Sequence, residues 1–146
     1  MVVGCQGNIM LKTVARAVLG LEGALALFAA VSLWFDPERV GAQLGVAPIG
    51  DLGLSTIRGD IGGLFAGAGC FMIATAITAD RRLIIPPLAY MALALSARTL
   101  SLALTAYAPE LLQPMLVEAV TIAILTAAYV ILGQTSANTG ATPSAT

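Results

Sequence analysis

Residues 57–78 read IRGDIGGLFAGAGCFMIATAIT, a stretch that is apolar apart from Arg58 and Asp60 near its start and a few threonines near its end. About 20 consecutive apolar residues are enough for a helix to cross the hydrocarbon core of a bilayer. A helix is the expected form, because a single open strand would leave its backbone groups unpaired in lipid. The stretch therefore predicts a transmembrane helix.

Similar stretches lie on both sides of it. The predicted spans cover residues 13–35, 57–78, 83–106 and 114–132. The second and third spans, and the third and fourth, are joined by links of a few residues, which favour antiparallel neighbours. The sequence therefore predicts an all-α fold, an antiparallel bundle of four transmembrane helices over residues 13–133.

The composition supports this class and excludes others. Hydrophobic residues make up 58% of the chain and charged residues 10%, with a mean hydropathy of +0.92. Soluble domains carry about 25% charged residues. The net charge of −1 gives no electrostatic footprint for nucleic acid. The chain has no histidine, the commonest metal ligand and general base, so we predict neither a metal nor a cofactor.

The two ends differ from the spans. Residues 1–12 are interpreted as an N-terminal leader. Residues 134–146 are rich in Ser, Thr, Ala and Gly and carry no charged side chain. Such a segment cannot bury a core, so it is predicted to be a disordered polar tail.

The distribution of Lys and Arg predicts the orientation. Lys12, Arg16, Arg81 and Arg82 fall on one side of the predicted bundle, and Arg39 and Arg58 on the other. The positive-inside rule then places both termini in the cytoplasm, and we expect a bacterial inner membrane. The link at residues 36–56 would face outward.

That link contains a helix signature. Asp36, Pro37 and Glu38 are typical of an N-cap, a first-turn proline and a first-turn acid. A short helix is predicted to begin there and to end near Gly45. Since Val40 and Leu44 share one side, it is expected to lie on the membrane surface.

Charged residues also occur within the spans. A charge in the hydrocarbon core costs free energy, so such residues are expected to be functional or paired with each other. Arg98 opens a polar stripe with Ser101 and Thr105, and Glu118 lies on the next span. Arg98 and Glu118 both lie toward their connecting link, so they are predicted to meet in the outer half of the bilayer. The pair is either a structural contact between helices or a charged site for a substrate or proton. Breaking it would cost about 3–5 kcal/mol by analogy with buried pairs.

Glu22 lies near the middle of the first span, with no basic residue at its level. It is either a neutral carboxyl group hydrogen-bonded to a neighbouring helix or a proton carrier.

The second span carries a glycine ridge at every fourth residue: Gly59, Gly63 and Gly67. Such a ridge allows close helix packing in lipid, or leaves a groove for a ligand. Arg58 and Asp60 point to different faces, and Arg58 is near enough to the surface to reach a lipid phosphate.

Several strings resemble a family. Residues 35–38 (FDPE), 57–64 (IRGDIGGL) and 97–102 (ARTLSL), with Glu118, resemble an uncharacterised bacterial group of four-helix membrane proteins, known only as a domain of unknown function and distantly similar to DoxX-like proteins. The similarity extends over residues 19–132. The shared residues fall on Arg58, Gly62, Gly63, Arg98, Ser101 and Glu118. The resemblance implies a fold and a polar set but no activity. Residues 106–109 (AYAP) depart from the Asp-Gly that the family often has after its third helix, so a site that this acid helps to form in relatives would be altered in this chain.

The sequence supports three hypotheses for the function. The first is binding of an amphiphile, an anionic small molecule or a lipid by Arg58, Asp60, Arg98, Ser101 and Glu118. In this interpretation Gly59, Gly62, Gly63, Gly67 and Glu22 are structural. The second is an accessory subunit of a membrane complex, or a homo-oligomer, in which the ions fix helix register. The third is a lipid-modifying enzyme that uses Glu118 or Asp60 as acid or base.

Overall fold

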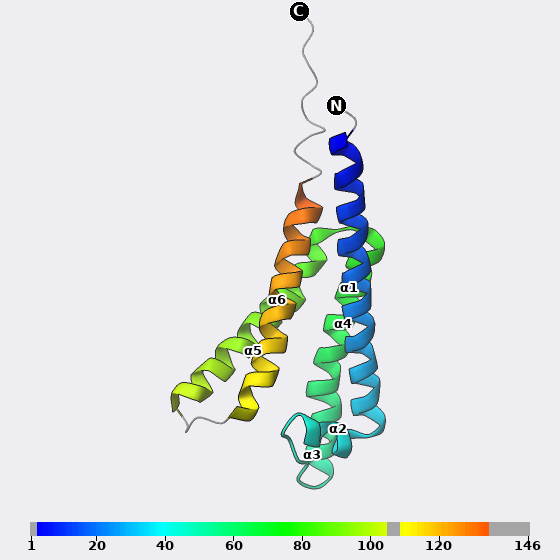
Figure 1. Cartoon of the computed structure of the whole chain (residues 1–146). Coiled ribbons are helices and arrows are strands. Elements are labelled where there is room, and N and C mark those ends of the chain that lie inside the picture. The colour runs from blue at the N-terminus through cyan, green and yellow to red at the C-terminus, as the bar shows by residue number, and fades with distance from the viewer. Residues whose placement is uncertain (1–2, 105–108, 135–146) are drawn as a thin grey trace, which may run out of the picture.

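The computed structural model describes residues 3–104 and 109–134, and every element in these ranges is helical (Figure 1). The elements are α1 (Val3–Phe35), α2 (Pro37–Gln43), α3 (Gly50–Thr56), the π-helical turn η1 (Ile57–Gly62), α4 (Gly63–Thr78), the 3-10 turn η2 (Arg81–Ile84), α5 (Ile85–Leu104), the 3-10 turn η3 (Pro109–Leu111) and α6 (Leu112–Gly133). The all-α prediction is confirmed. The predicted disorder of the tail and the place of Thr105 lie outside the described residues.

Four helical segments are long and apolar enough to cross a membrane: Asn8–Phe35, Gly50–Thr78, Arg81–Leu104 and Pro109–Gly133. The protein is thus a multi-pass membrane protein. Two boundaries differ from the sequence prediction. α1 already begins at Val3, inside the segment interpreted as a leader, and the second span begins at Gly50. Residues 3–35 and 50–78 contain no proline. Each helix can therefore extend, toward the N-terminus, beyond the apolar stretch that defined the predicted span.

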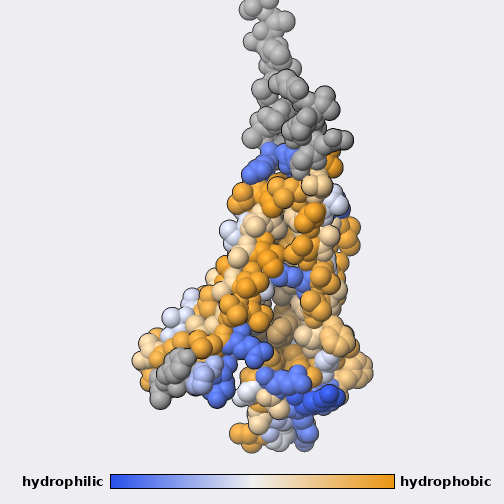
Figure 2. Space-filling view, in the orientation of Figure 1, coloured by the Kyte–Doolittle hydropathy of each residue, from blue (hydrophilic) through white to orange (hydrophobic). Residues whose placement is uncertain are grey.

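The surface of these helices is strongly apolar. Phe28 is 73% exposed and Leu93 70% exposed, and many other large apolar side chains are open as well. Figure 2 shows this apolar surface over the long helices. A soluble monomer rarely exposes so much contiguous apolar area, whereas hydrocarbon solvates it without penalty.

The long helices form two antiparallel hairpins. α1 packs along α4 in the most extensive helix pair, and α5 packs on α6. The hairpins meet at the end where α1 begins and α6 ends, and they diverge toward the end that carries α2 and α3 (Figure 1). The core lies at the joined end, in a cluster made up of Ala15, Leu19, Ala68, Met72, Ile84, Leu125, Ala128 and Leu132. Figure 2 shows the surface hollowed between the hairpins below this core.

Glycines allow α1 and α4 to touch, but not those of the predicted ridge. A Cβ atom built on Gly69 would lie 2.8 Å from the Gly23 carbonyl oxygen. In contrast, Cβ atoms on Gly59, Gly63 and Gly67 would meet no atom of the described residues within 4 Å. The interpretation of this ridge as a packing face within the chain is therefore wrong. The helix face turned toward α1 carries Gly62 and Gly69 instead.

Arginines fasten the first hairpin at both ends. At the joined end, Arg16 donates from Nε to the Ala76 carbonyl (2.7 Å) and from Nη2 to the Ile77 carbonyl (2.9 Å). At the other end, Arg58 Nε donates to the Trp34 carbonyl (3.0 Å). In each case an arginine on one helix satisfies carbonyl groups that the last turn of the other helix leaves open.

The π-helical turn η1 adds a return contact. The Trp34 indole Nε1 donates to the Arg58 carbonyl at 3.0 Å. A π turn shifts the backbone hydrogen-bond pattern, and such turns are frequent at functional sites. The close approach of Trp34 also explains Gly62, where a Cβ atom would lie 2.7 Å from the indole nitrogen.

The short helix in the first link is confirmed. The Asp36 side chain accepts from the Arg39 backbone N–H at 3.3 Å, and Pro37 occupies the first helical turn. α2 ends at Gln43, and Gly45 adopts the left-handed conformation (φ 75°) that terminates it.

Candidate functional site

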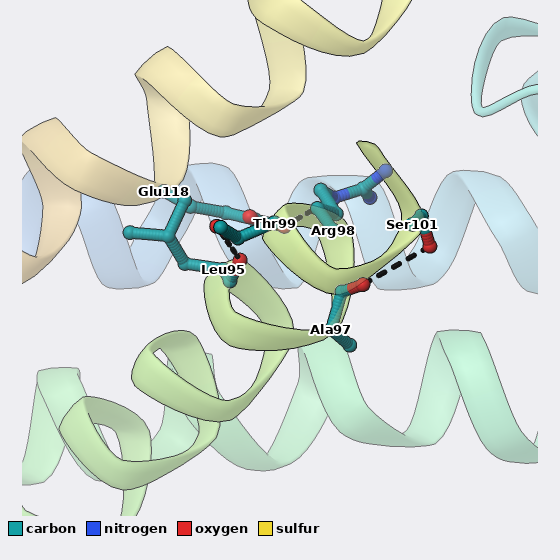
Figure 3. Close-up of polar contacts among 6 residues, drawn as sticks. All are labelled: Leu95, Ala97, Arg98, Thr99, Ser101 and Glu118. Atoms are coloured by element: carbon teal, nitrogen blue, oxygen red, sulfur yellow. Dashed lines mark hydrogen bonds and ion pairs between the residues drawn. The ribbon is translucent and has the colours of Figure 1, made fainter. Parts of the chain in front are cut away.

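Arg98 and Glu118 form the predicted ion pair. Arg98 Nε lies 2.7 Å from Glu118 Oε1, and the pair joins α5 to α6 (Figure 3). The Glu118 side chain is 11% exposed and that of Arg98 is 35% exposed. No other salt bridge occurs among the described residues.

The helix ends explain why the two charges meet. Arg98 lies six residues before the end of α5, and Glu118 lies six residues after the start of α6. With a rise of about 1.5 Å per residue, each is about 9 Å from its end of the hairpin. Antiparallel packing therefore brings both side chains to the same depth, well inside the candidate spans.

The pair is not saturated. A guanidinium group has five N–H donors, and the described residues accept only the hydrogen bond of Nε. Figure 3 shows the two terminal nitrogens of Arg98 directed away from Glu118. On the other side of the pair, Glu118 Oε2 is buried and has no hydrogen-bond partner in the part of the chain that the structure describes. Arg98 thus keeps N–H donors, and Glu118 keeps an acceptor oxygen, that the ion pair does not use.

The hydroxyl groups beside the pair bond to their own helix. Ser101 Oγ donates to the Ala97 carbonyl at 3.0 Å, and Thr99 Oγ1 donates to the Leu95 carbonyl at 2.8 Å (Figure 3). Each bond runs one turn back along α5, which is common for hydroxyl groups on helices in apolar surroundings.

Glu22 is a second carboxyl group inside the membrane-spanning region. Its Oε2 atom is buried without a hydrogen-bond partner among the described residues. Of the two interpretations of Glu22, the one that has its carboxyl group hydrogen-bonded to a neighbouring helix therefore finds no such bond at this atom. Glu22 follows Ala15 by seven residues and Leu19 by three, so it shares the face of α1 that lines the core.

Arg58 and Asp60 do not join this site. Both lie in η1, beside α2 and α3, and both are exposed. Arg58 holds Trp34 through its Nε, and neither residue bonds to Arg98 or Glu118 in the described chain. Of the five predicted ligand-binding residues, the structure thus pairs Arg98 with Glu118 and places Ser101 one turn further along α5. The role of Trp34 was missed; its one signal was an indole at the end of a span.

Two cavities elsewhere are lined almost entirely by apolar atoms. One of about 440 Å³ lies under the first link, lined by Val46, Ala47, Pro48, Ile49, Leu52, Gly53, Thr56, Ile57 and Ile61. Another of about 180 Å³ lies between α1 and α6. Neither contains a charged side chain, so neither supplies the polar contacts that orient a charged ligand.

No group of three or more His, Cys, Asp or Glu residues that could hold a metal ion is found in the described ranges. Comparison of the chain with protein-family models, curated proteins and solved structures finds no match. The chemistry of the Arg98–Glu118 site is therefore the basis for assigning a function.

Proposed function

We propose that this protein binds an amphiphile whose anionic head group is held by Arg98. The observation that supports this most directly is the unsaturated guanidinium group within a membrane span. A cation at this depth is costly unless protein, water or an anion satisfies it. Glu118 accepts a hydrogen bond from only one of the Arg98 nitrogens, Nε.

The shape of the pair favours a carboxylate or phosphate. Arginine presents its donors in a planar fork that binds such oxyanions through two parallel hydrogen bonds. Glu118 fixes the Nε side of the fork, which leaves the terminal nitrogens to an incoming group. The Arg98 side chain is 35% exposed, which gives that group access. The hollow between the two hairpins offers space beside apolar helices for the hydrocarbon part (Figure 2).

The substitution Arg98→Lys tests this function. Lysine keeps the charge but loses the planar fork, so co-purified lipid should fall severalfold while the folded state persists. Arg82→Lys is the matched control, because Arg82 is exposed in η2 and its side chain makes no described hydrogen bond. Bound lipid would be quantified by mass spectrometry and stability by thermal unfolding. A variant that is strongly destabilised yet retains the same lipids would contradict the proposal, as would a wild-type protein without bound lipid.

A second candidate is supported by the glycine ridge. Gly59, Gly63 and Gly67 leave open space beside the helix that carries them. A helix of another membrane protein, or of a second copy, could pack there closely. In this case the protein is an accessory subunit, and it should be unstable in detergent without its partner. A ligand binder should instead be stable alone and gain stability from its ligand.

We further propose a bacterial inner-membrane location with both termini in the cytoplasm, in keeping with the four-helix group that the sequence motifs resemble. Lys12, Arg16, Arg81 and Arg82 support this orientation. Arg16 bonds to the end of α4, and Arg81 lies over the Tyr129 ring (5.1 Å to its centroid) near the end of α6, so these basic residues gather at one end.

Cysteine labelling tests the orientation. In a background lacking Cys5 and Cys70, an impermeant reagent applied to intact cells should label Gly45→Cys and leave Ser136→Cys unlabelled. The reverse pattern would overturn the topology. Labelling of both positions after the cells are opened is the control for reactivity.

A further inference from the structure

Glu22 is an acidic residue in the interior of the membrane that the Arg98–Glu118 site does not use. It lies about midway along the first candidate span, Asn8–Phe35. Its Oε2 atom is buried without a hydrogen-bond partner, and the described residues form no salt bridge with it. A carboxylate in an apolar medium is stable only when a cation or several hydrogen-bond donors satisfy it, and otherwise the group becomes neutral by taking up a proton.

The elements packed on α1 supply no cation to Glu22. α1 contacts α4, η1, α6 and α2. Beside Glu22 the contact with α4 is apolar, since a Cβ atom built on Gly23 would meet Ile73 and Gly69. The described ionisable side chains on α1 and on these four elements are Lys12 and Arg16 on α1, Cys70 on α4, Arg58 and Asp60 in η1, Glu118 and Tyr129 on α6, and Glu38 and Arg39 on α2.

The arginines among them are engaged elsewhere or lie at the ends of the hairpin. Arg58 donates to the carbonyl group of Trp34, which follows Glu22 by twelve residues, or about 18 Å along the helix. Arg39 lies beyond that end, in α2. At the joined end, Arg16 donates to two carbonyl groups in the last turn of α4. The described residues of these elements therefore place no basic side chain beside Glu22.

A metal ion or an ammonium group does not fit this place either. Metal cations that bind oxygen need several ligands, and no group of three or more His, Cys, Asp or Glu residues that could hold one is found in the described ranges. An ammonium group would have to reach Glu22 Oε2, which the surrounding atoms close off. A proton needs neither space nor further ligands.

We infer that Glu22 is a protonated carboxylic acid and forms a proton-binding site inside the membrane, separate from the Arg98–Glu118 site. The two acids differ in their surroundings. Arg98 Nε lies 2.7 Å from Glu118 Oε1 and balances the charge of that carboxylate, whereas the described chain gives Glu22 no such cation. Glu22 as a whole is half-buried, so a proton reaches the carboxyl group from the side that is not packed. Acids that hold protons within membrane spans are typical of proton relays.

Infrared spectroscopy tests the protonation state directly. The purified full chain would be measured in a non-ionic detergent at neutral pH, and the spectrum of Glu22→Gln would be subtracted from that of the wild type. We expect the difference to contain the C=O band of a protonated carboxyl group, which shifts to lower frequency when D2O replaces water. Loss of carboxylate bands alone would show that Glu22 is ionised and would overturn the inference.

Two further variants assign the band to its residue. Glu118→Gln should retain the protonated-carboxyl band. If the band is lost in that variant and kept in Glu22→Gln, the proton belongs to the ion-pair site and the inference is refuted. Glu110→Gln is the control for an ionised acid, because Glu110 is exposed in η3, and it should lose carboxylate bands only.

Reaction of the wild-type chain with dicyclohexylcarbodiimide tests the site without any substitution. This apolar reagent enters detergent micelles and reacts with protonated carboxyl groups: the proton of the acid moves to one carbodiimide nitrogen, and a Glu22 oxygen bonds to the central carbon. Nothing leaves, so the modified peptide gains the mass of one reagent molecule. Peptide mapping by mass spectrometry should find severalfold more adduct at Glu22 than at Glu118 or Glu110. Equal or greater labelling at Glu118, or no adduct at Glu22, would contradict an accessible proton site.

Discussion

Replacement of Arg98 by leucine is expected to lower the free energy of unfolding by about 3–5 kcal/mol, the range for breaking a buried ion pair. The substitution leaves Glu118 buried in its helix interface without any partner, because Oε2 already has none in the described chain. Glu118→Leu should cost less. It leaves Arg98, whose side chain is 35% exposed and long enough to turn toward water or lipid head groups.

The double variant Arg98→Leu/Glu118→Leu separates the pair from the packing around it. Replacing a whole buried pair by apolar residues is often neutral, so the double variant should recover most of the loss. Denaturant unfolding of the wild type, both single variants and the double variant in one detergent gives the coupling energy. If the effects of the two single variants add up to that of the double variant, the coupling energy is zero and the ion pair contributes nothing to stability.

The main features of the fold could be predicted from the sequence because they depend on local patterns. Apolar length identified the four spans, and the sequence Asp36-Pro37-Glu38 identified the start of α2. The Arg98–Glu118 contact could also be predicted, because a short link fixes the register of two antiparallel helices and so matches the depth of the two charges.

The partners of the other charges could not be predicted in this way. Arg58 donates to the backbone carbonyl group of Trp34. Since every residue has such a carbonyl group, the residue types in the sequence do not indicate which residue Arg58 binds. Likewise, two glycine series compete on the second span. The regular series Gly59, Gly63, Gly67 has the expected spacing, but the rotation of the helix turns Gly62 and Gly69 toward α1. Hydropathy contains no information about that rotation when the whole helix is apolar.

The helix rotation leads to a prediction with a matched pair of glycines. Gly69→Ala should destabilise the protein by about 1–3 kcal/mol, the usual cost of overpacking. The added Cβ atom would lie 2.8 Å from the Gly23 carbonyl oxygen and 2.9 Å from Leu27 Cγ. Since one of these atoms belongs to the backbone of α1, relief requires the two helices to move apart rather than a side chain to turn. The separation of α1 from α4 should therefore also change the surroundings of Trp34, which joins α1 to Arg58 at the far end of the same hairpin.

Gly67→Ala is the control, two residues away on the same helix. Its Cβ atom would meet nothing within 4 Å, so the change should leave stability unaltered or raise it by about 0.5–1 kcal/mol through helix propensity. Thermal unfolding can be followed through the fluorescence of Trp34, the only tryptophan in the chain. If Gly67→Ala is instead as destabilising as Gly69→Ala, another helix must cover the ridge. Because the described chain supplies none, that result would favour an accessory subunit or a homo-oligomer over a monomeric ligand binder.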